Sequence, residues 1–178
     1  KGGVMIEPKR FSQEELERIS RGYIREIHNF IGADIDIPAP DVNTDAKIMA
    51  WMLDEYEKLK GRHSPATITG KPIALGGSRA RDYSTSMGGA YVLHELAHKK
   101  PNKTTVAVQG FGNVGMNIAR ILNEWGYKVV AVSDSRSGIY NKNGLNIKDV
   151  ITHKEKTGNL SKFKNTKEIT NEALLELK

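Results

Sequence analysis

The sequence predicts an α/β protein in which a mainly helical first part precedes a strand–helix–strand unit. Apolar residues recur at helical spacing in the first part, whereas two β-branched runs flank one helical run from Thr105 onward. A strand, a helix and a strand within about 30 residues form a βαβ unit with two parallel strands. Because one such unit is too small for a complete sheet, we expect the chain to be part of a longer protein.

The first part begins with a short apolar run, Val4–Ile6, which predicts a strand. Ser12 and Glu15 then have the spacing of a capping box, in which each side chain accepts a hydrogen bond from the other residue's backbone N–H. Apolar residues at helical spacing follow. We expect this helix to end at Gly32, because glycine readily adopts the left-handed conformation of a helix C-cap.

A proline-containing segment separates this helix from a second one. Pro38 and Pro40 exclude a helix and stiffen the chain in an extended conformation. Asn43 or Thr44 can cap the second helix, since short polar side chains accept hydrogen bonds from the first turn. Its apolar positions continue at helical spacing until Gly61, where we expect it to end.

The loop-rich stretch after the second helix contains the predicted domain boundary. We assign residues 1–66 to one domain and residues 67–178 to the next. A third helix is expected from about Thr85 to Lys100, where Pro101 stops it. The remaining expected elements are a strand at Val106–Gln109, a helix at Asn113–Glu124, a strand at Lys128–Ser133, an extended piece at Ile139–Tyr140, and helices near Ile147–Lys156 and Asn171–Leu177.

Three glycines, Gly110, Gly112 and Gly115, lie between the first strand of the βαβ unit and its helix. This G-x-G-x-x-G spacing, between a strand and a helix, is typical of dinucleotide binding. The first glycine permits a tight turn, the second lets a pyrophosphate approach the backbone, and the third allows the helix to pack closely on the strand. Asp134 ends the second strand, where a carboxylate can accept hydrogen bonds from an adenosine ribose.

The residues around Asp134 leave both NAD and NADP open as the cofactor. The Asp134 carboxylate favours NAD, because it would repel a 2′-phosphate. Ser135 and Arg136 follow directly, and a hydroxyl with a guanidinium could hold that phosphate.

Composition excludes several other classes of protein. The net charge is +6, but lysine and arginine are interspersed with acidic residues, so we expect no nucleic-acid partner. The chain has no cysteine, which excludes disulfides, cysteine nucleophiles and cysteine-ligated zinc. No apolar run reaches the ~18 residues of a membrane span, and the start has no signal-peptide pattern. We therefore expect a cytoplasmic protein without a membrane partner.

A rival motif, His94-Glu95-Leu96-Ala97-His98, lies on the expected third helix. On one helix the two imidazoles of H-E-x-x-H lie a turn apart and can bind zinc, with the glutamate as general base of a peptidase. Pro101 ends the helix soon afterwards, and no third ligand is placed nearby in the sequence. We therefore expect no metal here, and a zinc metallopeptidase remains the alternative from a different class.

Several segments together resemble the glutamate dehydrogenases of the Glu/Leu/Phe/Val dehydrogenase family, particularly the archaeal type. They are KGGV, DIPAPDVNTD, ITGKP, GGSRARDYST and VAVQGFGNVG, in the family's order. GFGNVG is shared with the leucine, phenylalanine and valine dehydrogenases, whereas IPAPD is the more glutamate-like segment. The resemblance covers essentially the whole chain. It implies the end of an α/β substrate domain followed by the start of a Rossmann-like dinucleotide-binding domain.

The resemblance also implies roles for particular residues. Lys1 matches the family's catalytic lysine, and Asp41 matches the aspartate of its proline loop. Thr85 matches a threonine near the nicotinamide, although Ser86 and Met87 stand where the family usually has glycine and arginine. The expected cofactor contacts are Thr85, Gly110, Phe111, Gly112, Asn113, Val114, Gly115, Asp134, Ser135 and Arg136.

The implied reaction is the reversible, NAD- or NADP-dependent oxidative deamination of L-glutamate to 2-oxoglutarate and ammonia. By resemblance, the protein is a homo-oligomer, namely a hexamer. A dehydrogenase of leucine, valine or phenylalanine from the same family remains open.

Overall fold

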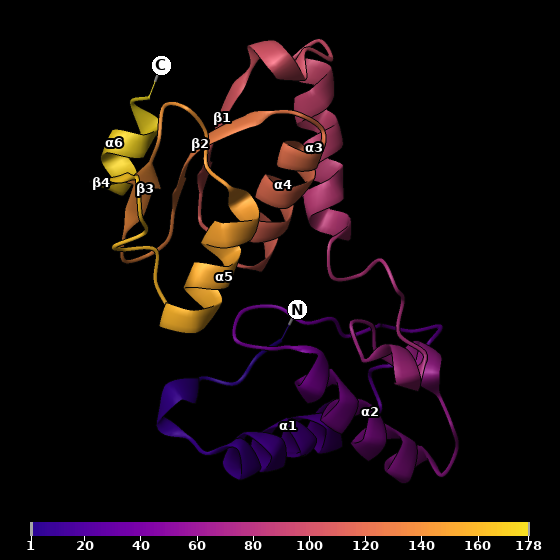
Figure 1. The fold of residues 1–178 in the computed structure, drawn as a ribbon. Helices are drawn as coiled ribbons and strands as arrows, with labels where there is room; N and C mark the ends of the chain where they lie inside the picture. The colour runs from indigo at the N-terminus through magenta and orange to yellow at the C-terminus, as the bar shows by residue number, and fades with distance from the viewer. Residues whose placement is uncertain (1, 178) are drawn as a thin grey trace. The chain divides into compact units, whose positions relative to one another are not determined.

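The computed structural model describes residues 2–177 (Figure 1), and the chain divides into two compact units between Arg81 and Asp82. The expected boundary between residues 66 and 67 therefore falls inside the first unit, before a loop that stays with it.

Two helices, α1 and α2, dominate the first unit. Its elements are η1 (Pro8–Arg10), α1 (Gln13–Ile27), α2 (Ala46–Lys60), η2 (Pro65–Thr67) and η3 (Ile73–Leu75). The capping box at the start of α1 is confirmed, since the Ser12 hydroxyl accepts from the Glu15 N–H and the Glu15 carboxylate accepts from the Ser12 N–H. The sequence pattern thus located this helix start correctly.

Three details of the first unit correct the sequence-based predictions. Val4–Ile6 is irregular rather than a strand. Helix α1 ends at Ile27, before the expected Gly32. Asp45, instead of Asn43 or Thr44, caps α2 through a hydrogen bond of 2.9 Å from the Ile48 N–H.

Helices α1 and α2 pack together through an apolar core and a charged edge. The core contains Ile24, Ile31, Met49, Met52, Leu53, Tyr56 and Ile68. At the edge, Glu55 of α2 is buried and accepts hydrogen bonds from Arg21 and Arg25 of α1. Because a buried carboxylate needs compensating donors, these contacts fix how the two helices pack.

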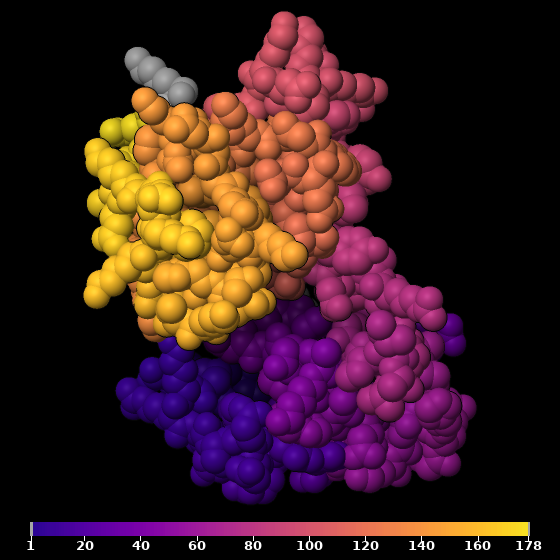
Figure 2. Space-filling model, viewed as in Figure 1, coloured from indigo at the N-terminus to yellow at the C-terminus, as the bar shows by residue number. Residues whose placement is uncertain are grey.

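The second unit is a four-stranded sheet with helices. Its elements are α3 (Ser84–Leu96), η4 (Pro101–Lys103), β1 (Thr105–Gln109), α4 (Asn113–Glu124), β2 (Lys128–Ser133), β3 (Gly138–Tyr140), α5 (Ile147–Thr157), β4 (Lys167–Ile169) and α6 (Asn171–Leu175). Figure 2 shows α5 and the C-terminal segment, coloured orange to yellow, on the visible face of this unit.

The sheet order is β1-β2-β3-β4, and the predicted parallel βαβ unit is confirmed. β1 and β2 run parallel with α4 between them in sequence, and Gln109 pairs with Ser133 at their carboxyl ends. β3 and β4 add to the sheet in antiparallel order, and β4 was not predicted. Its three residues, Lys-Glu-Ile, carry no apolar alternation that could reveal a strand.

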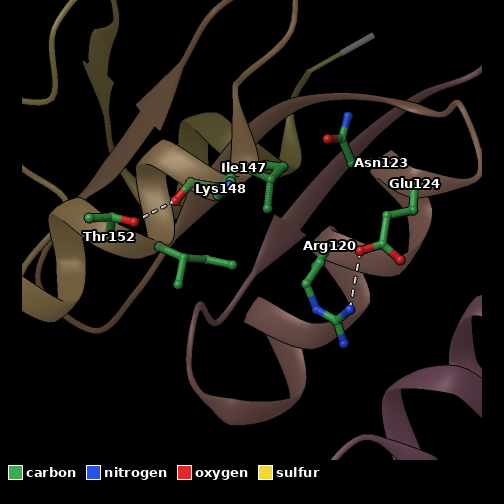
Figure 3. A pocket seen from close by; sticks show the side chains of 7 residues that line it. Arg120, Asn123, Glu124, Ile147, Lys148 and Thr152 are labelled. Atoms are coloured by element: carbon green, nitrogen blue, oxygen red, sulfur yellow. Dashed lines mark hydrogen bonds and ion pairs between the residues drawn. The ribbon is translucent and has the colours of Figure 1, made fainter.

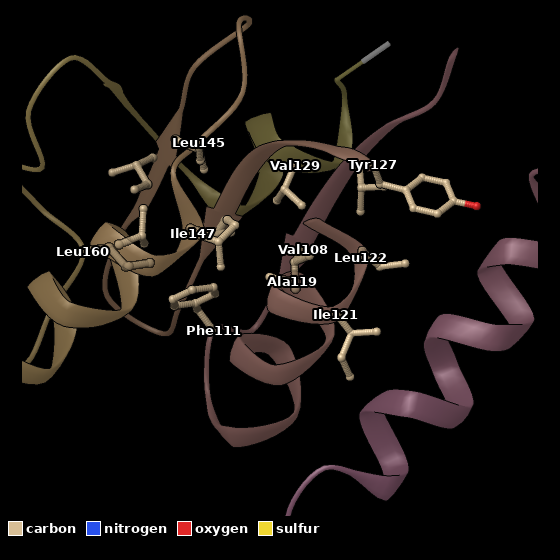
Figure 4. Close-up of a cluster of buried hydrophobic side chains, with 14 of the residues drawn as sticks. Val108, Phe111, Ala119, Ile121, Leu122, Tyr127, Val129, Leu145, Ile147 and Leu160 are labelled. Atoms are coloured by element: carbon tan, nitrogen blue, oxygen red, sulfur yellow. The ribbon is translucent and has the colours of Figure 1, made fainter. Parts of the chain in front are cut away.

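The main core of the second unit lies under α4, and α4 itself lies between the sheet and α3 (Figures 1 and 4). Its fully buried side chains include Phe111, Leu122, Val129, Ile139, Ile147 and Leu160. β2 is buried along nearly its whole length, as expected for a strand covered on both faces.

Candidate dinucleotide-binding site

The candidate site lies where β1 turns into α4. Gly110 follows β1 with φ +89°, a conformation that residues with side chains rarely adopt. The N–H groups of Gly110 and Phe111 both donate to the carbonyl oxygen of Ser133, at 2.8 and 2.6 Å. The turn is therefore attached to the carboxyl end of β2, which brings the glycine-rich loop next to the residues that follow β2.

The other two glycines have different physical roles. A Cβ on Gly115 would lie 1.9 Å from the carbonyl oxygen of Gly110, so only glycine lets α4 approach β1 this closely. Around a Cβ on Gly112, by contrast, the structure places no described atom within 4 Å. Gly112 is the N-cap of α4 and has no side chain that could satisfy the N–H groups of the first turn. An anion could therefore approach these N–H groups over Gly112.

The expected contacts from Phe111, Asn113 and Val114 differ in how they can reach a ligand. Phe111 is fully buried in the core, so only its backbone can face a cofactor (Figure 4). Asn113 is exposed at the start of α4, and its side-chain oxygen accepts a hydrogen bond of 3.1 Å from Asn117. Val114 is exposed, and its carbonyl accepts from the Ser86 hydroxyl at 2.9 Å.

Asp134 lies directly after β2, and both of its carboxylate oxygens have protein partners. Oδ1 accepts hydrogen bonds from the backbone N–H groups of Arg136 (2.9 Å) and Ser137 (3.0 Å). Oδ2 accepts one of 2.8 Å from the ammonium of Lys154. Burial raises the pKa of Asp134, but these hydrogen bonds outweigh it and hold the pKa below its ordinary value. Asp134 is therefore a fixed anion at neutral pH.

Lys154, in α5, is a site residue that the sequence analysis missed. Besides binding Asp134, its ammonium donates a hydrogen bond of 2.7 Å to the carbonyl oxygen of Phe111 in the glycine-rich loop. Only 19% of the Lys154 side chain and 11% of the Asp134 side chain are exposed. One lysine thus connects the loop before α4 to the aspartate after β2. In sequence it is one of several lysines in α5, which explains why no local pattern distinguished it.

The remaining expected cofactor residues of this unit are at the surface. Ser135 and Arg136 are exposed beside Asp134. Thr85 is exposed in the first turn of α3, and Ser86 next to it is buried because its hydroxyl binds the start of α4. The contact between α3 and α4 therefore places the N-terminal end of α3 next to the glycine-rich loop.

Asp41 lies in the first unit, on an exposed turn before α2. Its carboxylate accepts a hydrogen bond of 2.9 Å from the Val42 N–H, and its backbone N–H donates to the Thr44 hydroxyl at 2.6 Å. The preceding prolines are held by the segment 68–70: Pro38 accepts from the Thr69 N–H, and Pro40 packs against Gly70. The turn is thus fixed from both sides. Lys1, the expected catalytic lysine, lies outside the described residues.

The H-E-x-x-H motif does not form the helical arrangement that zinc binding requires. Helix α3 ends at Leu96, not near Lys100, and His98 has φ +51° beyond the helix end. His94 instead contacts the buried Tyr127, with 2.7 Å between Nδ1 and the hydroxyl oxygen. Among residues 2–177, no group of three or more His, Cys, Asp or Glu side chains is arranged to hold a metal ion.

The described chain also contains no helix with the length and apolarity to cross a membrane.

A groove of this unit is lined by residues of α4 and α5 (Figure 3). Ile147 and Ile151 are among its apolar lining residues. Arg120 and Glu124 pair with each other across 3.1 Å, and the Thr152 hydroxyl donates to the Lys148 carbonyl. Because these polar groups bind one another, and because the groove borders the C-terminal half of α4, we do not assign it to the site at the N-terminus of α4.

A parallel βαβ unit with this glycine spacing, an open helix N-terminus and an acid after the second strand is typical of dinucleotide-binding domains. Comparison with known families agrees. The family model for Glutamate/Leucine/Phenylalanine/Valine dehydrogenase matches residues 76–178, and the model for the dimerisation domain of the same family matches residues 1–58. The chain therefore belongs to the Glu/Leu/Phe/Val dehydrogenase family.

Individual relatives match most of the chain. It is 51% identical over 159 residues to an NADP-specific glutamate dehydrogenase from Synechocystis sp., covering 88% of this chain and 37% of the relative. It is 48% identical to a glutamate dehydrogenase from Thermotoga maritima, covering 99% of this chain and 44% of the relative. A hetero-hexameric glutamate dehydrogenase from Thermus thermophilus, solved in a Leu-bound form, has a TM-score of 0.91 at 37% identity, over 99% of this chain and 42% of that one. The chain thus spans less than half the length of these relatives.

Proposed function

We propose that this chain is part of an enzyme that catalyses the reversible, NAD(P)-dependent oxidative deamination of L-glutamate to 2-oxoglutarate and ammonia. The observation that carries the proposal is the open backbone over Gly112, beside Asp134, in a chain whose relatives are named glutamate dehydrogenases. When bound, the nicotinamide cofactor would accept a hydride from the substrate. The residues of this chain would bind the cofactor, orient the substrate and move protons.

The residues of the second unit fit a dinucleotide. The N–H groups of the first turn of α4 would hold the pyrophosphate over Gly112, because a helix N-terminus attracts anions. Asp134, Ser135 and Arg136 would face the adenosine ribose. Thr85, in the first turn of α3, and Asn113, in the first turn of α4, would also contact the cofactor.

We propose NADP as the preferred cofactor, although NAD fits the same loop. Lys154 offsets the charge of Asp134 across 2.8 Å, which weakens the repulsion that a lone carboxylate would exert on a 2′-phosphate. The exposed Arg136 guanidinium and Ser135 hydroxyl are suited to bind that phosphate. The relatives from Synechocystis sp. and Saccharolobus shibatae are named NADP-specific.

In this proposal two residues of the first unit move protons. Lys1 would take a proton from the water that attacks the oxidised carbon, and Asp41 would exchange a proton with the amino group. General acid–base groups of this kind contribute typically about 10²–10⁴ in rate. The stiff turn around Asp41 suits such a role, because a catalytic group must be held in a defined position.

The domain roles and the assembly are part of the same proposal. Residues 1–66 would belong to the substrate domain and residues 67–178 to the dinucleotide-binding domain. A homo-hexamer is proposed from the family resemblance; the relative from Thermus thermophilus is described as a hetero-hexamer, which supports six subunits but not their identity. We also propose a cytoplasmic location for this enzyme.

Steady-state assays of the complete protein test the proposal. Glutamate, leucine, valine and phenylalanine would each be supplied with NAD and with NADP, and dinucleotide reduction would be followed by absorbance. We expect the highest kcat/KM for glutamate with NADP. Faster turnover of an apolar amino acid would instead identify the other branch of the family, and no turnover of any of them would overturn the proposal.

A further inference from the structure

We infer that Asn171, in α6, is a positioning residue of the candidate dinucleotide site, because its side-chain amide holds the carboxyl end of β2. The inference rests on the proposed function, in which the glycine-rich loop and Asp134 bind the cofactor. Asn171 would act through two consecutive residues that carry this site, Ser133 and Asp134. It would set how tightly the dinucleotide binds, and it would take no part in moving protons.

The amide of Asn171 bridges the last residue of β2 and the residue after it. Its Oδ1 accepts a hydrogen bond of 2.6 Å from the Ser133 hydroxyl, and its Nδ2 donates one of 3.2 Å to the carbonyl oxygen of Asp134. A backbone carbonyl can only accept hydrogen bonds, so the NH₂ group faces Asp134 and the amide oxygen faces the hydroxyl. The donor and the acceptor of this side chain are therefore both used, in a single orientation.

Ser133 connects this amide to the glycine-rich loop. The residue is fully buried, and its carbonyl oxygen accepts hydrogen bonds from the N–H groups of Gly110 and Phe111. A buried hydroxyl that loses its partner is costly, so without the Asn171 amide the end of β2 would move until the hydroxyl finds another partner. Because the turn after β1 is bonded to Ser133, that movement would pass to Gly110 and Phe111.

Asp134 is held by residues of two later helices. Lys154 of α5 binds its carboxylate at 2.8 Å, and Asn171 of α6 binds its backbone carbonyl. The first contact fixes the charge, and the second fixes the stretch of chain that carries the charge. Only 11% of the Asp134 side chain is exposed, so its backbone cannot shift without disturbing the contact with Lys154.

Helix α6 offers the Asn171 amide from a fixed position. The helix packs against β1 and β2, and its Leu174 side chain is buried. Thr170, between β4 and α6, caps the helix by accepting a hydrogen bond of 3.1 Å from the Ala173 N–H. Just before this cap, β4 pairs with β3. Thr170 thus supports the helix, whereas Asn171 connects the helix to the end of β2.

Calorimetric titration of NADPH into the complete protein tests the inference. We expect Asn171→Ala to weaken binding about tenfold, since binding must then restore the positions of the loop and of Asp134. Asn171→Asp keeps the shape and the acceptor but loses the donor to the Asp134 carbonyl, so it should weaken binding to a similar degree. Thr170→Ala removes the cap of the same helix and keeps the amide; it is the matched control, with a change below about twofold.

A double-variant cycle shows whether Asn171 acts through Ser133. Ser133→Ala alone should also weaken binding. The pair Ser133→Ala/Asn171→Ala should bind NADPH no more weakly than Asn171→Ala, because the two changes remove the same hydrogen bond. In the enzyme, the KM for NADP should rise in these variants while the KM for glutamate stays unchanged. A role in stability alone would lower the melting temperature and leave both constants as they are.

The outcomes separate this inference from the proposed function. If the wild type binds NADPH but Asn171→Ala binds it as tightly as Thr170→Ala does, or if the effects of Ser133→Ala and Asn171→Ala multiply, the inference is overturned while the proposed function stands. If the wild type binds neither NADPH nor NADH, the proposed function fails, and hydrogen exchange decides the inference. In Asn171→Ala, the Gly110 and Phe111 amides should then exchange faster, relative to those of β2, than in the control variant. Equal relative exchange in both variants would overturn the inference.

Discussion

Two aspartates, Asp134 in the second unit and Asp41 in the first, are held in different ways. Asp134 is nearly buried, and its carboxylate receives hydrogen bonds from two backbone N–H groups and from Lys154. Asp41 is exposed on a turn, and its side chain accepts from the N–H of the next residue. Asp134 is thus placed by the fold around it, whereas Asp41 is placed by a short stiff segment at the surface.

The difference indicates which kind of chemistry each aspartate can perform. A carboxylate held by an ammonium and two N–H groups keeps its charge and its position, which suits binding. A carboxylate on an exposed, stiff turn can be held in a defined position beside a substrate, which suits acid–base work. We therefore expect changes at Asp41 to affect turnover and changes around Asp134 to affect binding and stability.

The largest effect is expected for Asp41→Asn in the complete protein. Asparagine keeps the shape of the side chain and can accept the same hydrogen bond, but it cannot exchange a proton. We predict a loss of about 10²–10⁴ in kcat with little change in melting temperature. The matched control is Asp45→Asn in the same loop, because asparagine replaces aspartate well as a helix cap. A rate above about a tenth of the wild type for Asp41→Asn would show that Asp41 is not the proton-transferring residue.

The next effect is expected for Gly115→Ala, which disturbs the support of the glycine-rich loop. The new Cβ would lie 1.9 Å from a backbone oxygen, so α4 and β1 must separate. We predict a loss of about 3 kcal/mol in the stability of the second unit, measured by hydrogen exchange of its strand amides. Gly88→Ala in α3 provides the control, since its Cβ would meet no described atom within 4 Å. Equal protection in both variants would contradict the packing role of Gly115.

Lys154→Met should have a moderate effect on stability and on dinucleotide binding. The variant leaves Asp134 and the carbonyl of Phe111 without their shared donor, at a cost of about 2 kcal/mol for hydrogen bonds to a charged group. Lys156→Met, on the exposed side of the same helix, should change the unfolding free energy by well under ~1 kcal/mol. Urea unfolding followed by signals from the second unit would compare the two. Similar midpoints would mean that Lys154 does not hold the loop.

The smallest effect concerns the pH dependence of Asp134. Its pKa in the folded protein lies below the ordinary value, so it contributes stability above the unfolded-state pKa of about 3.9 and loses it as the pH falls through the folded-state pKa. The stability difference between the wild type and Asp134→Asn should therefore be constant near neutral pH and shrink below about pH 4. Unfolding midpoints across this range would measure it, and a difference independent of pH would contradict the assignment.

The backbone of the candidate site was predictable from the sequence, and its side-chain connections were not. Gly110, Gly112 and Gly115 are required by local geometry, so their spacing alone located the loop, the parallel strands and the helix between them. Lys154 reaches the same loop from a later helix, through a tertiary contact that sequence spacing does not encode. A sequence can therefore predict the fold around a site without revealing every residue that completes the site.

In the first unit, one helix cap was predicted correctly from the sequence and the other was not. The capping box at Ser12 is a local signal and was correctly predicted, but Asp45 replaced the expected caps. Asn43 adopts φ +57° and the Thr44 hydroxyl binds Asp41, so the turn itself uses both residues. Competition between a turn and a helix cap for the same side chains is decided by tertiary structure, and periodicity cannot resolve it. The functional interpretation of Asp41 came from family resemblance alone.

Calorimetric titration of NADPH into the wild type and into Gly112→Val tests the central claim, that the open backbone at the start of α4 receives the cofactor's pyrophosphate. No described atom lies within 4 Å of a Cβ at Gly112, and φ there is −89°, so valine should fold without strain but occupy the space that the phosphates need. We predict that the wild type binds NADPH and that Gly112→Val, with an unchanged melting temperature, shows no measurable binding. A Gly112→Val variant that binds NADPH as tightly as the wild type would contradict the claim.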